Sequence, residues 1–164
     1  MRTMNTRIRH ADVRDRQSIV RCVRATLQDM ESVGGHEVNP DESFWQRYGE
    51  QIIESIGKRD RLYLLAEGGS DVVGYLEGKI NKLHEVFSQK KDFHISAVYV
   101  IPEYRQRKIA TLLVKEAFRW AFEQGCQEAD LSVLFNNDKA IGLYKKFDFK
   151  VFRYELRMKI PTMA

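Results

Sequence analysis

The stretch that decides the fold is Phe93–Thr111, with the sequence FHISAVYVIPEYRQRKIAT. Residues 93–101 are the most apolar run of the chain, and a run without apolar–polar alternation is typical of a strand covered on both faces. After Pro102, apolar residues at helical spacing predict a long helix over about 107–124, which ends at Gly125. The apolar arc of this helix is broad, so we expect the helix to lie flat on a sheet.

The junction between this strand and this helix carries three positive side chains, Arg105, Arg107 and Lys108. A helix N-terminus leaves backbone N–H groups without partners and adds partial positive charge. Cations at a helix start oppose the helix dipole unless an anion is present. The junction therefore suits a pyrophosphate; basic residues that simply decorate an exposed turn are the alternative interpretation.

Outward from this stretch, helical and strand patterns alternate along the chain. Two helices are predicted before it, one from Asp12 to about Met30 and one, capped by Asn39, from there to about Ile56. One more helix, capped by Asn136 or Asn137, is predicted after it and reaches Lys146. Further strands are predicted at residues 6–10, 62–67, 72–80, 129–134 and 149–160.

The resulting order, β-α-α-β-β-β-α-β-α-β, predicts one α/β (α+β) domain. Short links join most neighbouring strands, so we expect a mixed, mostly antiparallel central sheet flanked by about four helices. This domain is expected to span residues 6–160, between short tails at 1–5 and 161–164.

Composition narrows the class of protein. The 164 residues are 43% hydrophobic and 30% charged, with 10 Gly and 3 Pro, which excludes a disordered, collagenous or low-complexity chain. The formal charge of +4 allows a polyanionic partner without requiring one. Neither a signal peptide nor an apolar membrane span is apparent, so we expect a cytoplasmic protein that does not engage a membrane.

Cysteine and histidine usage gives no sign of a metal. Cys22 and Cys126 are too few and too far apart for a zinc cluster of common spacing, and the four histidines are scattered. Cys126 follows a helix C-terminus, where the dipole disfavours a thiolate nucleophile. We therefore expect neither a metal site nor cysteine catalysis.

Two blocks of residues resemble the GNAT N-acetyltransferase superfamily. Residues 98–113, VYVIPEYRQRKIATLL, are similar to motif A of that family, and residues 131–149, LSVLFNNDKAIGLYKKFDF, are similar to motif B. The blocks come in the family's order and on the expected elements, and the resemblance covers about residues 6–160. Lys108 stands where motif A has its middle Gly, and Asp148 stands where a Gly is usual. We expect a helical backbone at Lys108, which would leave its N–H able to donate.

The resemblance implies transfer of an acetyl group from acetyl-CoA to a primary amine of a small molecule or peptide, by direct attack in a ternary complex. In the family, the central strand bulges and splays from the next strand, and the pantetheine arm pairs with it. Carried over, the backbone of Val98, Tyr99 and Val100 would hold this arm, and one N–H would polarise the acetyl carbonyl. The pyrophosphate would lie against the junction, formed by Arg105, Gln106, Arg107, Lys108, Ile109, Ala110 and Thr111.

The resemblance also implies a general acid. Tyr144 matches the family's usual acid, whose phenol protonates the departing CoA thiolate, a transfer between groups of comparable pKa. A core aromatic with a satisfied hydroxyl is the alternative interpretation. Asn137 would meet the cofactor near the entry to the last helix, or would only cap that helix.

The general base is less defined. Many family members carry a Glu just before the Val-x-Val pair, but this chain has Ser96 and Ala97 there. His94 shares strand parity with Ser96 and Val98, so we expect it to face the cleft and take the role of base. Asp92 has the same parity and is a weaker choice.

The loop between the first two helices lines the acceptor site in this family. In this chain that loop carries Glu31, His36 and Glu37, and the two carboxylates suit a cationic amine, although ordinary solvated charges explain them too. Homodimers are common in the family, and no segment of the sequence identifies an interface.

Two other classes of function stay open. The chain could be a CoA-binding regulatory protein without catalysis, since the strand carboxylate is missing. It could also be a basic nucleic-acid-binding module that uses the charges at 105–108 with Tyr99 or Tyr104. No aromatic pair of an RNA-binding sheet or other recognised motif is present, so we expect no nucleic acid partner.

Overall fold

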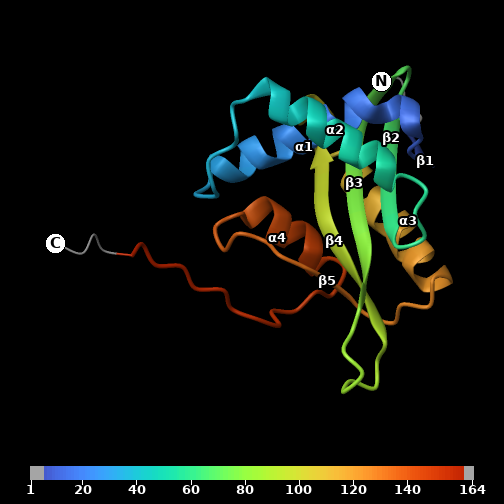
Figure 1. Cartoon of the computed structure of the whole chain (residues 1–164), viewed down its shortest axis with the longest axis vertical. Helices are drawn as coiled ribbons and strands as arrows, with labels where there is room; N and C mark the ends of the chain where they lie inside the picture. The colour runs from blue at the N-terminus through green and yellow to red at the C-terminus, as the bar shows by residue number, and fades with distance from the viewer. Residues whose placement is uncertain (1–5, 161–164) are drawn as a thin grey trace.

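A computed structural model describes residues 6–160 and shows a twisted sheet with helices on both faces (Figure 1). The sheet has the strand order β1-β2-β3-β4-β5, in which β1 to β4 are antiparallel neighbours and β5 is parallel to β4. The expected mixed, mostly antiparallel sheet is confirmed. Its strands are β1 (Thr6–His10), β2 (Arg61–Gly68), β3 (Asp71–Lys82), β4 (Lys91–Val100) and β5 (Ala129–Leu131).

Four α-helices in this part of the chain match the predicted ones. They are α1 (Arg16–Glu31), α2 (Glu42–Ser55), α3 (Ile109–Glu123) and α4 (Asp138–Lys145). A 3-10 turn at Val13–Asp15 leads into α1, and the Asp12 side chain caps it as expected. None of the helices in residues 6–160 combines the length and the apolar character that crossing a membrane requires.

The cap of α2 differs from the prediction. The side chain of Asn39 accepts a hydrogen bond from the N–H of Asp41 at 3.0 Å, so it forms a local turn ahead of the helix. Asp41 takes the capping role instead, because its carboxylate accepts from the N–H of Ser43 at 2.9 Å. The helix therefore begins at Glu42, three residues after Asn39.

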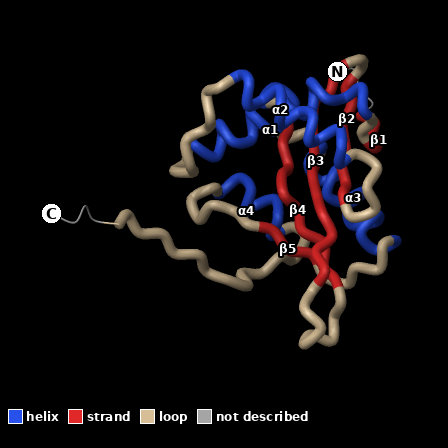
Figure 2. Tube along the Cα trace, viewed as in Figure 1, coloured by secondary structure: helices blue, strands red, loops and turns tan. Residues whose placement is uncertain are grey.

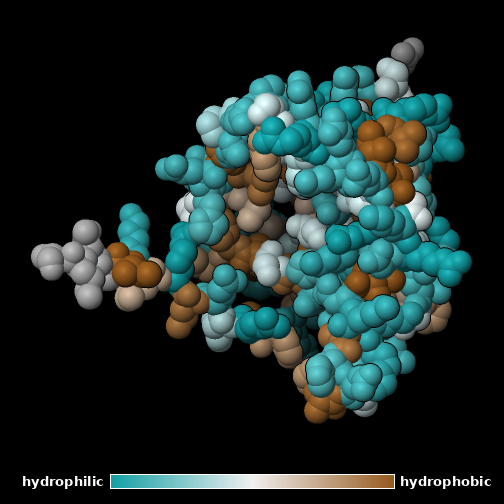
Figure 3. All heavy atoms as spheres, viewed as in Figure 1, coloured by the Kyte–Doolittle hydropathy of each residue, from teal (hydrophilic) through white to brown (hydrophobic). Residues whose placement is uncertain are grey.

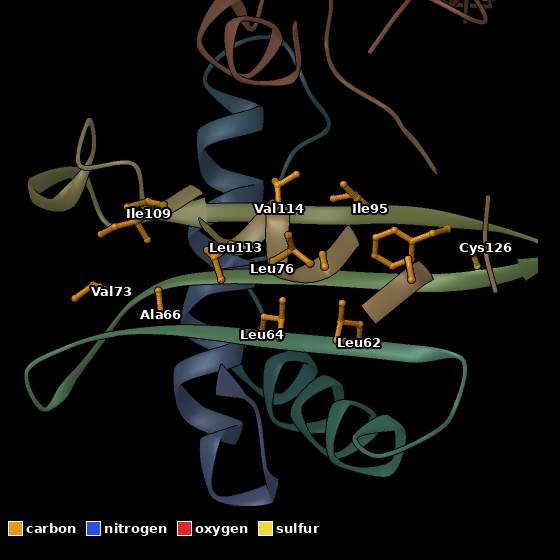
Figure 4. Packing of buried hydrophobic residues seen from close by; sticks show 14 residues of the cluster. Leu62, Leu64, Ala66, Val73, Leu76, Ile95, Ile109, Leu113, Val114 and Cys126 are labelled. Atoms are coloured by element: carbon orange, nitrogen blue, oxygen red, sulfur yellow. The ribbon is translucent and has the colours of Figure 1, made fainter. Parts of the chain in front are cut away.

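The sheet separates two hydrophobic clusters. The apolar face of α3 packs on one side, where Figure 4 shows Ile109, Leu113 and Val114 beside side chains of β2, β3 and β4. Helices α1 and α2 cover the other side, with Ile19 and Trp45 among the buried residues. The broad apolar arc of the long helix has the consequence expected from sequence, because α3 lies along the sheet.

The predicted strand at 149–160 is absent from the described structure, and this expectation was wrong. Phe149 still packs against the ring of Tyr144, with centroids 5.7 Å apart. From Lys150 to Ile160 the chain is exposed and forms no strand with another described segment, and it leaves the body of the molecule (Figures 1 and 2). The period-two pattern of this segment favours a strand, but a strand requires a partner, and this segment pairs with no strand of the described chain. The expected short tails at 1–5 and 161–164 lie outside the described residues.

Candidate active site

Strand β4 is irregular at its centre. Ala97 pairs with Glu77 and Ile95 pairs with Gly78, so Ser96 is an extra residue that bulges from the ladder. On the other side, β5 pairs with β4 only over Phe93–Ile95. From Ser96 to Val100, no described strand lies beside this edge, and the bulge and splay that the resemblance implies are both confirmed.

The open edge of β4 presents backbone groups of Val98 and Val100. The N–H of Ile101 donates to the carbonyl of Val73 on β3 at 3.0 Å. Because successive backbone N–H groups of a strand point to opposite sides, those of Val98 and Val100 point away from β3. The edge can therefore pair with a ligand in an extended conformation.

The turn into α3 has a left-handed backbone at Gln106 and at Lys108, each with φ of 63°. The expectation of a helical φ at Lys108 was wrong, because Lys108 directly precedes α3 and does not belong to its first turn. Where left-handed and right-handed backbone conformations alternate, successive N–H groups point into one concave spot, and such a spot can bind an anion. In the described chain, the N–H groups from Gln106 to Thr111 have no acceptor, so six donors lie at the positive end of α3.

The cations of this junction have different surroundings. Arg105 is tied to the protein, since its Nε donates to the carbonyl of Val100 at 2.9 Å and its Nη2 meets Asp29 Oδ2 at 2.7 Å. The guanidinium of Arg107 lies over the ring of Tyr104, 5.2 Å from its centroid, and its residue is exposed like Lys108. Arg105 therefore holds the junction against α1, and the charges of Arg107 and Lys108 remain accessible.

Helix α4 lies on the β5 side of β4 (Figure 1) and carries two of the predicted residues. The side chain of Asn137 caps it, accepting from the N–H of Ala140 at 3.2 Å. Burial raises the pKa of Tyr144 to about 12, which keeps its phenol protonated at neutral pH. The Tyr144 hydroxyl makes no hydrogen bond with another described residue, so it is free to donate to a ligand.

The bulge changes which face His94 occupies. Ile95 and Val98 both pack into the cluster under α3, whereas Ala97 packs under α1 and α2. His94 is paired with Lys79, two residues beyond Glu77 on β3, and so lies on the face of Ala97, opposite to Val98. The expectation that the side chains of His94 and Val98 share one face of β4 was wrong, because the extra residue at the bulge inverts the alternation between them.

A carboxylate that sequence reasoning missed accompanies His94. The Nδ1 atom of His94 lies 2.6 Å from Oδ1 of Asp130. Asp130 is on the neighbouring strand β5 and is the residue that pairs with His94 there. Such a contact fixes the proton on Nδ1 and leaves Nε2 as an acceptor. Asp92, the weaker candidate, accepts from Asn81 Nδ2 at 3.0 Å instead. The parallel register of β5, which pairs distant residues, carried no local sequence signal.

Glu77 on β3 is a second carboxylate that was missed. Residues paired across strands point to the same face, so Glu77 lies beside Ala97, where many family members carry an acid. The buried hydroxyl of Tyr75 donates to Glu77 Oε2 at 2.6 Å. Burial, and then the charge of Glu77, raise the pKa of Tyr75 well above its usual value. Only the bulged register brings this acid opposite Ala97.

The predicted acceptor residues lie in the loop after α1. Glu31 is exposed, and its Oε2 accepts from the N–H of Val38 at 3.3 Å, so it braces this loop. Glu37 is exposed as well. Elsewhere, burial raises the pKa of the free thiol of Cys22 to about 11. Residues 6–160 contain no cluster of three His, Cys, Asp or Glu side chains able to hold a metal ion.

Comparison with known proteins agrees with this geometry. A family model described as the Acetyltransferase (GNAT) family matches residues 23–149. Thialysine N-epsilon-acetyltransferase of Mus musculus is 30% identical over 86% of this chain and 82% of its own length. An N-alpha-acetyltransferase of Sulfurisphaera tokodaii is 29% identical over 60% of this chain and 62% of its own. The chain therefore belongs to the GNAT family of acetyltransferases.

Solved structures show the same fold at lower identity. A protein of Clostridium acetobutylicum described as a predicted acetyltransferase, solved with acetyl-CoA, superposes with a TM-score of 0.77 at 16% identity, over 94% of this chain and 96% of that one. The aminoglycoside N-acetyltransferase AAC(6')-Iy in complex with CoA gives a TM-score of 0.76 at 14% identity, over 97% of both chains. Helices on both faces of a mixed sheet are thus the arrangement of this class of enzyme.

Proposed function

We propose that this protein transfers the acetyl group of acetyl-CoA to a primary amine by direct attack in a ternary complex. The observation that carries the proposal is the open edge of β4 beside a turn of six unpaired N–H donors, residues 106–111. The edge suits an extended amide-bearing arm, and the turn suits a pyrophosphate. Arg107 and Lys108 add accessible positive charge, while Arg105 acts by positioning the turn against Asp29.

The open edge also supplies the electrostatic part of catalysis. An N–H of Val98 or Val100 would donate to the acetyl oxygen as negative charge develops on it. Such fixed donors require no reorganisation during the reaction. The pantetheine arm would run past Val98, Tyr99 and Val100, and Asn137 would meet it at the start of α4 while still capping that helix.

Tyr144 would act as general acid. The neutral amine nitrogen forms a bond to the acetyl carbon and loses its surplus proton to solvent, the carbon–sulfur bond breaks, and the phenol gives its proton to the departing thiolate. The pKa of about 12 means that the proton is present at neutral pH. The departing thiolate would receive this proton, and the phenolate left on Tyr144 would take a new proton from solvent.

His94 would act as general base. An ammonium group cannot attack, so a proton must leave the amine first. Asp130 holds the Nδ1 proton at 2.6 Å, which leaves Nε2 of His94 to take the amine proton, directly or through water. Asp130 is therefore a positioning residue in this proposal.

The acceptor would be a cationic amine of a small molecule or peptide. Glu31 and Glu37 of the loop after α1 offer exposed carboxylates, and Glu77 adds one beside Ala97. Amines of different sizes are supported by a relative that is a thialysine N-epsilon-acetyltransferase and by an aminoglycoside N-acetyltransferase of the same fold. A CoA-binding protein without catalysis is the second candidate, favoured by the residues Ser96 and Ala97 at the usual acid positions.

The test is release of free thiol from acetyl-CoA in the presence of polyamines, aminoglycosides, amino acids or peptides. We expect amine-dependent release, and we expect Tyr144→Phe to lower kcat about ten-fold to a hundred-fold with little change in acetyl-CoA binding. The matched control is Tyr154→Phe, which removes an exposed hydroxyl outside the site.

Full activity of Tyr144→Phe across the pH range would refute the role of acid. Binding of acetyl-CoA without release for any amine would favour the regulatory protein.

Two variants test the base. With the reactive amine, His94→Gln should lower kcat/KM strongly, and Asp130→Asn should lower it less, because the imidazole stays in place but loses the carboxylate that orients it through Nδ1. An unchanged kcat/KM in both variants would exclude His94 as base.

A further inference from the structure

A cavity of about 310 Å³ lies at the end of the sheet where β1 stops short of β2. The ladder between the two strands ends at the pair His10–Leu64, and the N–H of Ala11 adds one last bond to the carbonyl of Tyr63 at 2.9 Å. The first residues of β2 therefore have β3 on one side, and no strand of the described chain covers their other side. Residues at the C-terminal ends of α2 and α3 enclose the rest of this space.

The turn that leads into β2 brings three positive side chains to the cavity. Lys58, Arg59 and Arg61 all line it, and the lining contains no Asp or Glu. None of the three forms an ion pair with a carboxylate of residues 6–160. Figure 3 shows mostly hydrophilic atoms over this loop between α2 and β2, which Figure 1 places at the right of the view. A hollow lined by charges of one sign attracts a ligand of the other sign, so this cavity suits an anion.

Two aromatic rings form a fixed wall of the same cavity. Trp120 is half-buried, and its ring packs edge-to-face on the buried Phe93 with centroids 5.7 Å apart. Tyr63 is buried, and its hydroxyl lies 2.7 Å from Oγ of Ser55. Both rings are thus held by contacts within the fold, and both line the cavity. A fixed aromatic surface suits a ligand that carries a planar ring.

The cavity is separate from the turn of free N–H donors at residues 106–111. Helix α3 begins at Ile109, beside that turn, and Trp120 belongs to its last turns. Because each helical residue adds about 1.5 Å, Trp120 lies about 16 Å along the axis from Ile109. Cavities that hold small molecules commonly measure ~300–1,000 Å³, so this one has the size for a single small ligand.

We propose that this cavity is a second ligand site, which binds a small phosphorylated molecule with a planar ring, of the nucleoside monophosphate class. A phosphate group offers several charged acceptor oxygens, and arginine binds it through paired hydrogen bonds. The phosphate lies among Lys58, Arg59 and Arg61, and the ring lies against Trp120. The inference adds a site at the far end of α3 and does not depend on the proposed reaction.

Tryptophan fluorescence reports directly on this cavity. The chain has two tryptophans, and Trp45 is 2% exposed beneath the other helices, so a ligand in the cavity acts on Trp120. We expect saturable quenching by at least one of AMP, GMP, CMP and UMP, with calorimetric titration giving the same affinity. Absence of saturable binding for all four nucleotides would overturn the proposal.

Charge-matched variants test the role of the arginines. The double variant Arg59→Gln, Arg61→Gln should weaken binding of the tightest nucleotide by about ten-fold or more, because it removes both guanidinium groups that hold the phosphate. The matched control is Lys82→Gln, Lys90→Gln, which removes two exposed charges from the hairpin between β3 and β4 and should leave binding unchanged. Far-UV circular dichroism shows that each variant is folded. Equal weakening in both variants would mean that overall charge, and not this cavity, attracts the nucleotide.

Competition separates the cavity from the proposed CoA site, because CoA itself contains an adenosine phosphate. We expect the nucleotide to bind with the same affinity when CoA is present at a saturating concentration. Loss of nucleotide binding in the presence of CoA would place the nucleotide at residues 106–111 and refute a second site. Ribose 5-phosphate, which has the phosphate without the planar ring, should bind about five-fold more weakly or worse. Equal affinity of ribose 5-phosphate would contradict the role of Trp120.

Discussion

At Lys108 and Asp148 the backbone is left-handed, at the two positions where the resembling motifs carry glycine. A non-glycine residue pays about 1–2 kcal/mol for this conformation. The turn geometry is therefore retained without the residue that adopts it most easily. At Lys108 the side chain adds a charge beside the free N–H groups, which offers a reason for the substitution.

Replacing Lys108 with Gly tests whether the lysine adds backbone strain and a charge that helps to bind the ligand. Lys108→Gly should raise the free energy of unfolding by up to about 1 kcal/mol, because glycine adopts φ of 63° without steric cost. The same change should weaken acetyl-CoA binding several-fold through the lost charge. Urea denaturation and calorimetric titration measure the two effects. Asp148→Gly is the control, since it relieves similar strain away from the turn; a Lys108→Gly protein that binds acetyl-CoA more tightly would contradict the account.

The ion pair between Arg9 and Asp15 makes stability depend on pH. The two nitrogens Nη1 and Nη2 of Arg9 meet the Asp15 carboxylate at 2.7 and 2.8 Å, and this pairing lowers the pKa of Asp15. A lowered folded-state pKa stabilises the fold above the usual value of 3.8, and this contribution is lost as pH falls through the folded value.

Asp15→Asn should therefore cost about 1–2 kcal/mol at pH 7 and progressively less below pH 4. Urea denaturation at several pH values checks this. A penalty that is constant from pH 7 to pH 2 would show that Asp15 acts through packing or helix geometry and not through its charge.

At the scale of elements, the β-bulge in β4 requires a small residue on β3. A Cβ atom at Gly78 would lie 2.4 Å from the ring of the buried Phe93. Gly78→Ala should cost about 1–3 kcal/mol through overpacking and should disturb the bulge. Gly142→Ala is the control, because nothing lies within 4 Å of that Cβ, and alanine in the exposed face of α4 should add about 0.5–1 kcal/mol. Thermal unfolding compares the two; equal stability of both variants would contradict this packing.

Apolar spacing was sufficient to predict most elements, because burial enforces the period of a helix or strand. It failed where the ladder departs from its period. The bulge at Ser96 inverts the parity of His94 relative to Val98, and no residue type marks it in the sequence. Asp130 lies beside His94, and Glu77 lies beside Ala97, because of the register between neighbouring strands. Local sequence patterns do not contain this register.

The C-terminal segment shows the opposite case. Its alternation predicts a strand at 149–160, yet a strand forms only where another strand pairs with it. The pattern specifies which side chains share a face, while the partner strand depends on the rest of the fold. The sequence therefore indicated a strand for which residues 6–160 supply no neighbour.

At the scale of the whole molecule, two cores hold the sheet from either side and leave one edge of β4 open. The chain buries α3 on one face and α1 with α2 on the other, so β4 remains fixed although β5 leaves it after Ile95. The splay is thus a stable feature of the fold rather than a frayed end. It leaves the N–H groups of Val98 and Val100 unpaired on the side of β4 where α4 lies.

Ligand binding should stabilise the whole fold. If acetyl-CoA binds only the folded chain, a concentration 100-fold above Kd adds about 2.7 kcal/mol. For a domain of this size the thermal midpoint should rise by about 5–10 °C. Differential scanning fluorimetry with acetyl-CoA, and with dephosphorylated pantetheine as a ligand without the pyrophosphate, checks both the effect and its source. Equal shifts with both ligands would argue against a role for the turn.

The backbone amides of Gln106 to Thr111 test the central claim most directly. In a ¹⁵N-labelled protein titrated with CoA, the account predicts downfield shifts of these six amide protons, together with those of Val98 and Val100, as phosphate and pantetheine accept their hydrogen bonds. Shifts that leave these amides unchanged and appear elsewhere on the sheet would contradict it.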